Sequence, residues 1–298
     1  MLLVTDVTGY VSKAVVAELA QRSVPVRVLT PEGPAAAATI ADPGSAVYPN
    51  LATYVEWIRG SACDPSAVAN AMQGVEAVFL ATPLSPKMAD EHLRVVTAAK
   101  SAGVSRVVQL SGVAADQDIC CTRALRWLGQ AEAAISTTAL TITRLRPTFL
   151  MQNLLEFAPS IAQQGVIAGP FRTTRWTWVD ARDVAGVAVE ALLNPKHADQ
   201  TYTVTGAEAL SYQEVAERLS QVWGKPIRYV DITANEARGW LQSKGIPPVM
   251  IEAKLEMWDA CASNFINVAP TEVVKEVTGK PPRSIDDFAR DYRAQFLG

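Results

Sequence analysis

The sequence predicts an α/β protein in which a doubly wound parallel sheet is followed by a smaller, helix-rich lobe. Two observations carry this prediction. Short runs of β-forming residues alternate with helical patterns through the first half of the chain, as βαβ units require. The first run, 2–5, also leads through a turn into an amphipathic segment that begins at Val11. This strand–turn–helix step is typical of a Rossmann-like core, in which a diphosphate rests on the helix N-terminus.

The elements of this core follow from the hydrophobic periodicity, which differs between strands and helices. Strands are predicted at residues 2–5, 26–30, 54–58, 77–80, 106–110 and 140–145. Helices are predicted between them at residues 11–21, 65–72, 87–102 and 122–136. The segment 31–52 holds several proline and glycine residues and a run of four alanines, so it predicts a long loop insertion.

The second half of the chain changes character, because helical patterns predominate from residue 233 onward. Helices are predicted at residues 149–164, 183–193 and 211–222, and strands at 176–179, 201–204 and 227–230. We therefore expect a Rossmann-like core over residues 1–147 and a substrate lobe over 148–298, with 177–206 returning to the core sheet.

Composition and charge argue against several classes of protein. The 298 residues are 49% hydrophobic and 19% charged, with a net charge of −3 that offers no basic face for nucleic acid. No apolar run reaches the roughly 18 residues that span a membrane. The four cysteines show no metal-ligand spacing, so we expect no metal site. The neighbours Cys120 and Cys121 are expected as small core or loop residues, the alternative being a reactive pair. Because the first predicted strand starts at residue 2, we expect no signal peptide and a cytoplasmic protein.

Several segments carry a resemblance to a known family. They include Leu110-Ser111-Gly112 at the end of the fifth strand and Leu145-Arg146-Pro147 at the end of the sixth. The segments are 74–80, 102–108, 110–112, 145–147 with 151–153, 178–184, 205–208 and 277–288. In this order they resemble the NmrA-like branch of the atypical short-chain dehydrogenases over nearly the whole chain. The resemblance implies a Rossmann fold, and structural roles at helix and strand ends for Asp180, Arg182 and Asp183.

The resemblance also implies NAD(P)(H) as the cofactor, bound by the turn after the first strand and by the end of the fourth strand. Backbone amides of that turn and a few side chains hold the dinucleotide in this fold. The positions that the family assigns to the cofactor are Thr5, Thr8, Gly9, Tyr10, Val11, Thr82 and Pro83.

This chain departs from the family pattern where the cofactor would bind. In T-G-x-x-G-x-x-G, the first and third glycines are here Asp6 and Ser12. The arginine that takes the 2′-phosphate in NADP-preferring relatives corresponds to the segment 30–32, which offers no cation, and the acid that faces adenine corresponds to Ser61. We expect cofactor binding to be weak or lost. The alternatives are NAD(H) bound through backbone amides of residues 8–11, and an Asx turn at Asp6 in place of the glycine turn.

The usual proton donors are missing as well. The Tyr-x-x-x-Lys pair of ordinary relatives is absent, and the basic residue that atypical relatives place four residues before a glutamate is here Leu128. The remaining candidates for catalysis are Ser111, Tyr10 and Asn153. Aromatic and sulfur side chains after the sixth strand suit a flat, apolar ligand, although core packing is the alternative for each of them. The predicted substrate pocket comprises Phe149, Met151, Trp176 and Leu128.

These features favour an enzyme of bacterial-type specialised metabolism that acts on an aromatic, polyketide- or quinone-like small molecule. The chemistry is predicted as redox or non-redox, the latter being coupling, cyclisation or isomerisation in the aromatic pocket. The alternatives are an NAD(P)H-dependent quinone or ene-type reductase and a non-catalytic NAD(P)-sensing regulator. The sequence leaves a homodimer open and predicts neither a nucleic-acid nor a membrane partner.

Overall fold

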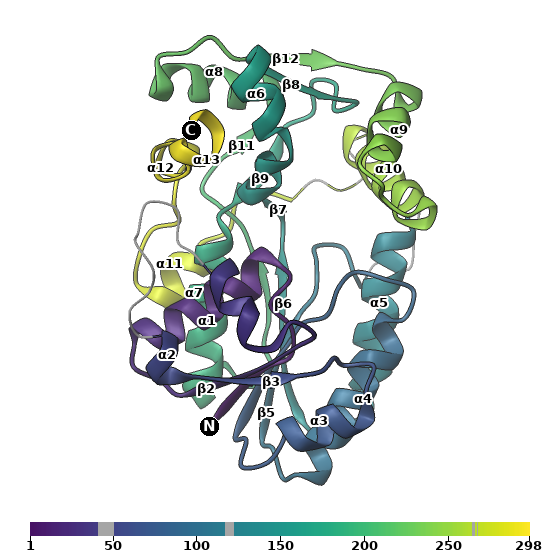
Figure 1. Cartoon of the computed structure of the whole chain (residues 1–298), viewed down its shortest axis with the longest axis vertical. Helices are drawn as coiled ribbons and strands as arrows, with labels where there is room; N and C mark the ends of the chain where they lie inside the picture. The colour runs from purple at the N-terminus through teal and green to yellow at the C-terminus, as the bar shows by residue number, and fades with distance from the viewer. Residues whose placement is uncertain (41–50, 117–121, 264–265, 267) are drawn as a thin grey trace.

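The computed structural model describes residues 1–40, 51–116, 122–263, 266 and 268–298 of the chain. Cys120 and Cys121, for which the sequence allowed two interpretations, lie outside these residues. The chain forms a large sheet flanked by helices, and a second lobe that packs beyond one end of the sheet (Figure 1).

The large sheet has seven strands in the order β10-β6-β5-β4-β1-β2-β3, and every neighbouring pair is parallel. Its strands are β1 (Leu2–Val4), β2 (Val26–Thr30), β3 (Val55–Arg59), β4 (Ala77–Leu80), β5 (Arg106–Leu110), β6 (Thr141–Pro147) and β10 (Thr201–Val204). The strand order reverses at β1, which lies between β2 and β4. Such a switch point opens a crevice beyond the carboxyl ends of the strands. The sheet confirms the predicted doubly wound fold.

Helices cover both faces of this sheet, because its strand residues alternate between two hydrophobic cores. Val4 of β1 packs in one core with α1 and α7, whereas its neighbour Leu3 packs in the other with α3 and α4. The first face carries α1 (Tyr10–Gln21), α7 (Ala181–Leu193) and α11 (Val273–Thr278), and the second carries α3 (Pro65–Ala71), α4 (Met88–Ser101) and α5 (Arg123–Ser136). Within the segment 31–52, a 3-10 helix η1 (Gly33–Thr39) and a short helix α2 (Leu51–Tyr54) are described.

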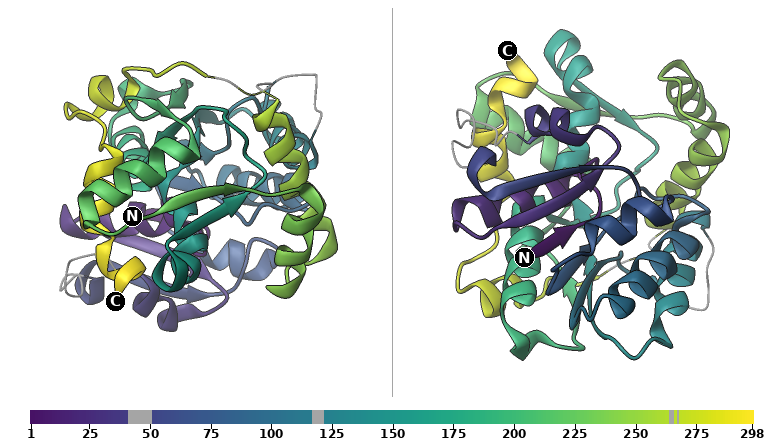
Figure 2. Two further views of the ribbon diagram at one scale, coloured as in Figure 1. Left: turned by 90° about the horizontal axis from the view of Figure 1, so that it is seen from above. Right: turned by 60° about the horizontal axis from the view of Figure 1, so that its bottom comes forward.

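The lobe holds its own core, which is rich in aromatic side chains. Two small sheets, β11-β9-β7 and β12-β8, form its frame. Their strands are β7 (Phe149–Leu150), β8 (Val166–Gly169), β9 (Trp176–Val179), β11 (Ala209–Leu210) and β12 (Arg228–Asp231). Its helices are η2 (Met151–Phe157), α6 (Ala158–Gln164), α8 (Tyr212–Trp223), α9 (Ala234–Ser243), α10 (Pro248–Ala262), α12 (Ile285–Asp291) and α13 (Arg293–Leu297), and η3 (Pro195–His197) precedes β10 of the core. The chain ends in the lobe, where α13 lies beside α6 (Figure 2).

Two predicted elements differ from the structure. The helix expected over 149–164 is divided into β7, η2 and α6. Phe149 and Leu150 pair with β9 instead of starting a helix, and Pro159, which lacks an N–H, stands in the first turn of α6. The strand 176–179 pairs with β7 and β11 of the lobe, and only β10 returns to the large sheet by pairing with β6. The division of the chain at residue 147 stays a prediction.

Candidate functional site

The turn after β1 is closed by a side chain where relatives use glycine. The Asp6 carboxylate accepts hydrogen bonds from the backbone N–H of Thr8 at 3.0 Å and from the Thr8 hydroxyl at 2.6 Å. This Asx-type geometry confirms the alternative expected from the sequence. Burial raises the pKa of Asp6, while its hydrogen bonds to Thr8 act in the opposite direction. The turn therefore forms without the first glycine, and a buried carboxyl group stands where the glycine would have no side chain.

Helix α1 begins with an open N-terminus just beyond this turn. Its N-cap, Gly9, has extended backbone angles and makes no side-chain capping bond, and the first turn of the helix contains no acidic residue. A Cβ placed on Gly9 would meet no atom within 4 Å, so open space lies beside the N-cap residue. Unpaired N–H groups and the positive end of the helix dipole favour an anion at such a position.

The threonines beside the turn have different roles. Thr5 bridges β1 and the end of β4, since its hydroxyl donates to the Ala81 carbonyl at 2.6 Å and accepts from the Ala81 N–H at 3.0 Å. The hydroxyl of Thr82, in contrast, is buried and finds no hydrogen-bond partner within the described parts of the chain. A buried polar atom without a partner calls for an explanation, and a ligand over the switch point supplies one. The open helix and this hydroxyl both fit a bound dinucleotide.

The end of β2 carries the groups that a nucleotide ribose would meet. The hydroxyl of Thr30 donates to the Glu32 carboxylate, and this bond is the main reason why the pKa of Glu32 is lowered. The nearby Lys13 acts in the same direction. Arg59, at the end of the neighbouring strand β3, donates to the Glu32 backbone carbonyl at 3.4 Å. The segment 30–32 itself offers no cation, as expected, but Arg59 reaches it from β3, which the sequence did not indicate.

A mostly apolar cavity of about 240 Å3 opens at the carboxyl ends of β5 and β6; we call it the β5–β6 pocket. Its walls come from the start of α1, the strand ends, α5 and α10, and Figure 1 shows α10 next to the upper end of α5. The lining residues are Val11, Leu110, Ser111, Gly112, Val113, Leu125, Leu128, Pro147, Thr148, Phe149, Leu150, Asn153 and Met257. The structure thus brings together Ser111, Asn153, Leu128 and Phe149 of the predicted site. Met257 is an addition that no sequence pattern marked.

Ser111 is held from behind by an ion pair. Its hydroxyl donates to the Glu132 carboxylate at 2.5 Å, and the same carboxylate binds Arg146 through two hydrogen bonds of 2.9 and 2.5 Å. Arg146 also pairs with Asp116 at 2.6 Å. The hydrogen bond to Glu132 is the largest cause of the raised pKa of Arg146. Because its proton is directed at Glu132, Ser111 presents oxygen lone pairs, not a proton, to the pocket.

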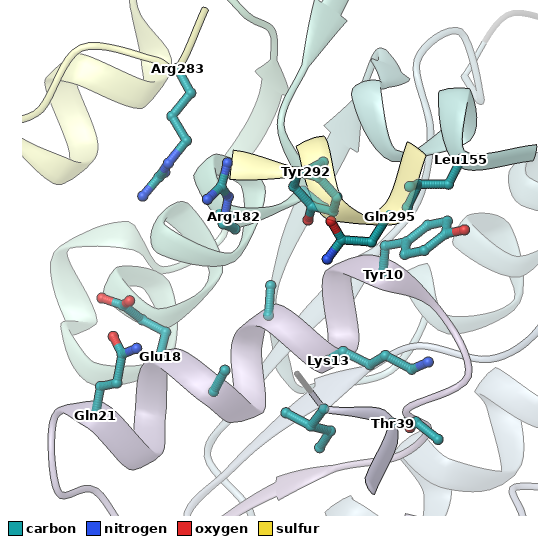
Figure 3. A pocket seen from close by; sticks show the side chains of 14 residues that line it. Tyr10, Lys13, Glu18, Gln21, Thr39, Leu155, Arg182, Arg283, Tyr292 and Gln295 are labelled. Carbon is teal, nitrogen blue, oxygen red and sulfur yellow. The ribbon is translucent and has the colours of Figure 1, made fainter. Parts of the chain in front are cut away.

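Three other predicted residues lie elsewhere. Tyr10 lines a separate groove of about 310 Å3 along the outer face of α1, near Leu155 (Figure 3). Trp176 is 3% exposed and packs in the lobe core against Phe149, with ring centroids 4.1 Å apart. Met151 is buried in the same core. The expectation that these side chains share one pocket with Ser111 is corrected: Tyr10 lines a different groove, and Met151 and Trp176 are packed in the lobe core.

The segment around Asp180 has the expected structural role. Asp180 is the N-cap of α7 and accepts from the Arg182 N–H at 2.9 Å. The guanidinium of Arg182 also binds the carboxylates of Asp180 and Asp291, which joins α7 to the C-terminal helices. Asp183 accepts from the Arg283 N–H at 2.7 Å, and burial raises the pKa of Asp183 to about 6. These contacts attach the lobe's last segment to the core and do not face the β5–β6 pocket.

The comparisons with known proteins agree with this geometry. A model of the NmrA-like family matches residues 1–264. The chain belongs to the NmrA-like family. It is 34% identical over 296 residues to an NAD(P)H azoreductase of Xenophilus azovorans, with 99% of both chains covered. It is also 34% identical over 299 residues, again with 99% of both covered, to a (4-alkanoyl-5-oxo-2,5-dihydrofuran-3-yl)methyl phosphate reductase of Streptomyces griseus subsp. griseus.

Solved structures share the same fold. An NADPH-dependent quinone oxidoreductase from Escherichia coli, determined with NADPH, superimposes with a TM-score of 0.81 at 21% identity, covering 97% of this chain and 99% of the other. The family is thus one of NAD(P)-binding, Rossmann-fold proteins with reductases among its members, as the resemblance implied. No helix among the residues that the structure describes is long and apolar enough to cross a membrane.

Proposed function

We propose that this protein is an NAD(P)H-dependent reductase of a flat, aromatic small molecule bound in the β5–β6 pocket. The observation that carries the proposal is the position of Val11, which lies in the first turn of α1, directly after the cofactor turn, and also lines the pocket. A dinucleotide lying over the turn would therefore bring its nicotinamide end to the pocket. The names of the relatives support this reductase function, which was one of the alternatives predicted from the sequence, and lend no support to coupling, cyclisation or isomerisation.

The chain's own residues bind, orient and shield the reactants. When bound, the dihydronicotinamide supplies a hydride. The open N-terminus of α1 would hold the diphosphate, and the Thr82 hydroxyl would gain the partner that it lacks. Apolar walls such as Leu128 and Met257 exclude water from the reacting atoms. The lone pairs of Ser111 and the amide of Asn153 fix the orientation of the ligand.

We further propose that NADPH binds weakly and no better than NADH. The ionised Glu32 lies at the end of β2, where it would accept from the 2′-hydroxyl of an NADH ribose and repel the 2′-phosphate of NADPH. Arg59 opposes this effect in part, but its hydrogen bond to the Glu32 backbone carbonyl is long, at 3.4 Å. Asp6 adds negative charge near the diphosphate for both dinucleotides.

Binding measurements with the unmodified protein test the proposal. Calorimetry with NADH and with NADPH gives the two dissociation constants, and tryptophan fluorescence reports on the binding of a naphthoquinone. We expect NADH binding, naphthoquinone binding, and NADH oxidation that requires an aromatic acceptor. If neither dinucleotide binds while an aromatic ligand does, the reductase proposal is wrong. A sub-micromolar constant for NADPH alone would overturn the stated cofactor preference.

A further inference from the structure

We infer that Trp176 is a specificity-determining residue, whose indole N–H binds a carbonyl oxygen of the substrate in a small cavity next to the β5–β6 pocket. We call this small cavity the annex. The inference rests on the proposed reductase function and adds the place of one substrate oxygen. It follows from the position of the annex, from an unpaired buried donor and from the scarcity of donors in the pocket itself.

The annex is a cavity of about 10 Å3 between the β5–β6 pocket and the lobe. Val113, Thr148 and Phe149 line both cavities, so the annex and the pocket share part of one wall. Trp176 and Thr177 of β9 line the annex alone. A space of this size admits about one water-sized atom. The annex can therefore receive a single oxygen at the edge of a ligand, but not a ring.

The indole N–H of Trp176 is a buried donor without a partner. Trp176 is 3% exposed, and its Nε1 makes no hydrogen bond within the parts of the chain that the structure describes. Trp178, two positions further along β9, differs, because its Nε1 donates to the Leu210 carbonyl at 2.9 Å. An unpaired buried donor costs free energy, and such groups are rare in folded proteins. Since Trp176 lines the annex, a ligand oxygen placed there supplies the missing acceptor.

Packing holds the indole ring of Trp176 in place. Its ring centroid lies 4.1 Å from that of Phe149, 5.2 Å from that of Tyr212 and 5.4 Å from that of Phe171. A ring surrounded at these distances cannot turn its N–H toward another acceptor. The donor is thus oriented before a ligand arrives, and a fixed donor loses no conformational freedom on binding.

The pocket itself offers few protons to a ligand oxygen. The Ser111 hydroxyl donates to Glu132, and none of the described residues that line the pocket is acidic or basic. The amide of Asn153 and the hydroxyl of Thr148 are the remaining polar side chains of this lining. Thr148 makes only a long hydrogen bond, at 3.4 Å, to a backbone carbonyl of β10, so its proton is free to turn toward a better acceptor in the annex. Trp176 and Thr148 therefore provide two donors for one oxygen.

A conjugated carbonyl compound uses these donors when it is reduced. As the substrate receives a hydride at a ring carbon, a new C–H bond forms and the displaced π electrons move onto the carbonyl oxygen. The substrate is reduced at the expense of the dihydronicotinamide, and its oxygen takes a proton from water as the product leaves. Donors aimed at this oxygen stabilise the negative charge that it gains. The annex thus favours flat substrates with a carbonyl group at the ring edge over substrates without one.

Binding without a cofactor tests the annex directly. The probes are 2-acetylnaphthalene and 2-isopropenylnaphthalene, which have nearly the same shape, although only the first carries an oxygen. Titrations that follow ligand fluorescence give the ratio of the two affinities. Trp176→Phe keeps an aromatic ring and removes the N–H, so it should lower the preference for the ketone about fivefold. An unchanged ratio would overturn the inference.

The matched control is Trp178→Phe, which removes an indole N–H from the same lobe core but away from the annex. It leaves the Leu210 carbonyl unpaired, so it should destabilise the protein toward urea more than Trp176→Phe does, without changing the ligand ratio. Equal changes of the ratio in both variants would assign the effect to the lobe core and overturn the inference. If Trp176→Phe does not fold, Thr148→Val removes the second donor instead. It should lower the ratio about threefold, and no change there would count equally against the annex.

Nuclear magnetic resonance locates the hydrogen bond in the unmodified protein. Tryptophan labelled with 15N gives separate indole N–H signals, and the signal of Trp176 is the one absent from Trp176→Phe. The ketone should move this signal downfield, as a new hydrogen bond requires, and the alkene should not. No shift with the ketone, or the same shift with both ligands, would contradict the inference.

Turnover separates this inference from the proposed function. With NADH and 1,4-naphthoquinone, Trp176→Phe should lower kcat/KM at least about tenfold, and Trp178→Phe less than about twofold. If the unmodified protein reduces naphthoquinone and Trp176→Phe does so equally well, the annex inference fails while the reductase function stands. If NADH neither binds nor is oxidised with any aromatic acceptor, the proposed function fails, and the affinity ratio still decides whether Trp176 binds the oxygen.

Discussion

The two ends of the binding crevice are built in different ways. At the cofactor end, the turn after β1 lacks two of the family's glycines but still forms, because the Asp6 carboxylate accepts a hydrogen bond from the Thr8 N–H. The N-cap of α1, which follows this turn, makes no side-chain capping bond. At the β5–β6 pocket, side chains determine what can bind, and the nearby charges are paired away from the cavity. Backbone N–H groups can bind a diphosphate whatever the side chains beside them are, whereas each substitution of a lining side chain changes the chemistry of the pocket. The cofactor end is therefore compatible with a dinucleotide, although Leu128 replaces the basic residue that the family resemblance implies.

The largest expected effect tests whether the pocket depends on its buried ion pair. Glu132 and Arg146 have side chains that are 9% and 13% exposed. Arg146→Ala leaves the buried Glu132 carboxylate with the more distant Arg144, at 3.8 Å, in place of its bidentate partner. We therefore expect a loss of about 3 kcal/mol in the free energy of unfolding, measured with urea. Arg290→Ala is the matched control, since Arg290 and Asp287 form a pair with both side chains largely exposed, and its loss should stay under about 1 kcal/mol. Similar losses in both variants would show that the buried ion pair contributes no more to stability than the exposed one.

The second prediction concerns the polar pair beneath the pocket end of β5. His92 is fully buried, its Nδ1 lies 3.0 Å from the Gln109 amide nitrogen, and burial lowers the pKa of His92 to about 4. The neutral ring is thus favoured in the folded state, so its contribution to stability is complete above the ordinary pKa and is lost as pH falls toward 4. The unmodified protein should lose about 3 kcal/mol between pH 7 and pH 4 through this group.

His92→Gln should remove that part of the acid sensitivity while it keeps an acceptor for Gln109. Urea unfolding at both pH values measures the difference between the two proteins. An unchanged pH dependence in the variant would show that His92 does not titrate as the burial implies.

The third prediction returns to the cofactor turn. The double substitution Asp6→Gly and Ser12→Gly restores the family pattern and removes a carboxylate near the diphosphate, so dinucleotide affinity should rise about tenfold by calorimetry. Asp6→Asn separates the two causes, because an amide oxygen can keep the bond to the Thr8 N–H without the charge. If the asparagine variant gains nothing and the double variant gains the full factor, geometry, and not charge, limits binding. Weaker binding in the double variant would show that the Asx turn is needed.

The smallest expected effect separates the two dinucleotides. Glu32→Gln removes one exposed charge at the end of β2, so the ratio of NADPH to NADH affinity should rise about fivefold. Arg59→Leu should shift the same ratio in the opposite direction, because it removes the cation that reaches this segment. Calorimetry with both cofactors measures the two ratios. If neither variant changes the ratio, the 2′ position of the ribose lies elsewhere.

Local patterns predicted the core, and long-range pairing explains what they missed. The strands of the large sheet follow from short apolar runs, and the Asx turn follows from the single residue Asp6. The sequence could not show that Trp176 lies in the lobe core and not in the pocket, since aromatic residues in a core and in a ligand pocket occur in the same sequence patterns. Nor could it show that Arg59 reaches Glu32 or that Ser111 donates to Glu132. These contacts join residues 21 or more positions apart.

Gly112 gives the pocket a simple means of changing its shape. A Cβ on this residue would lie 2.8 Å from Cδ1 of Leu128, the far end of a flexible side chain, and it would meet no other atom within 4 Å. An alanine at position 112 would therefore rotate one leucine and leave the backbone as it is. A single methyl group would therefore change the shape of the cavity while the backbone stays in place. The pocket can thus change its shape through a residue that contributes no side chain of its own.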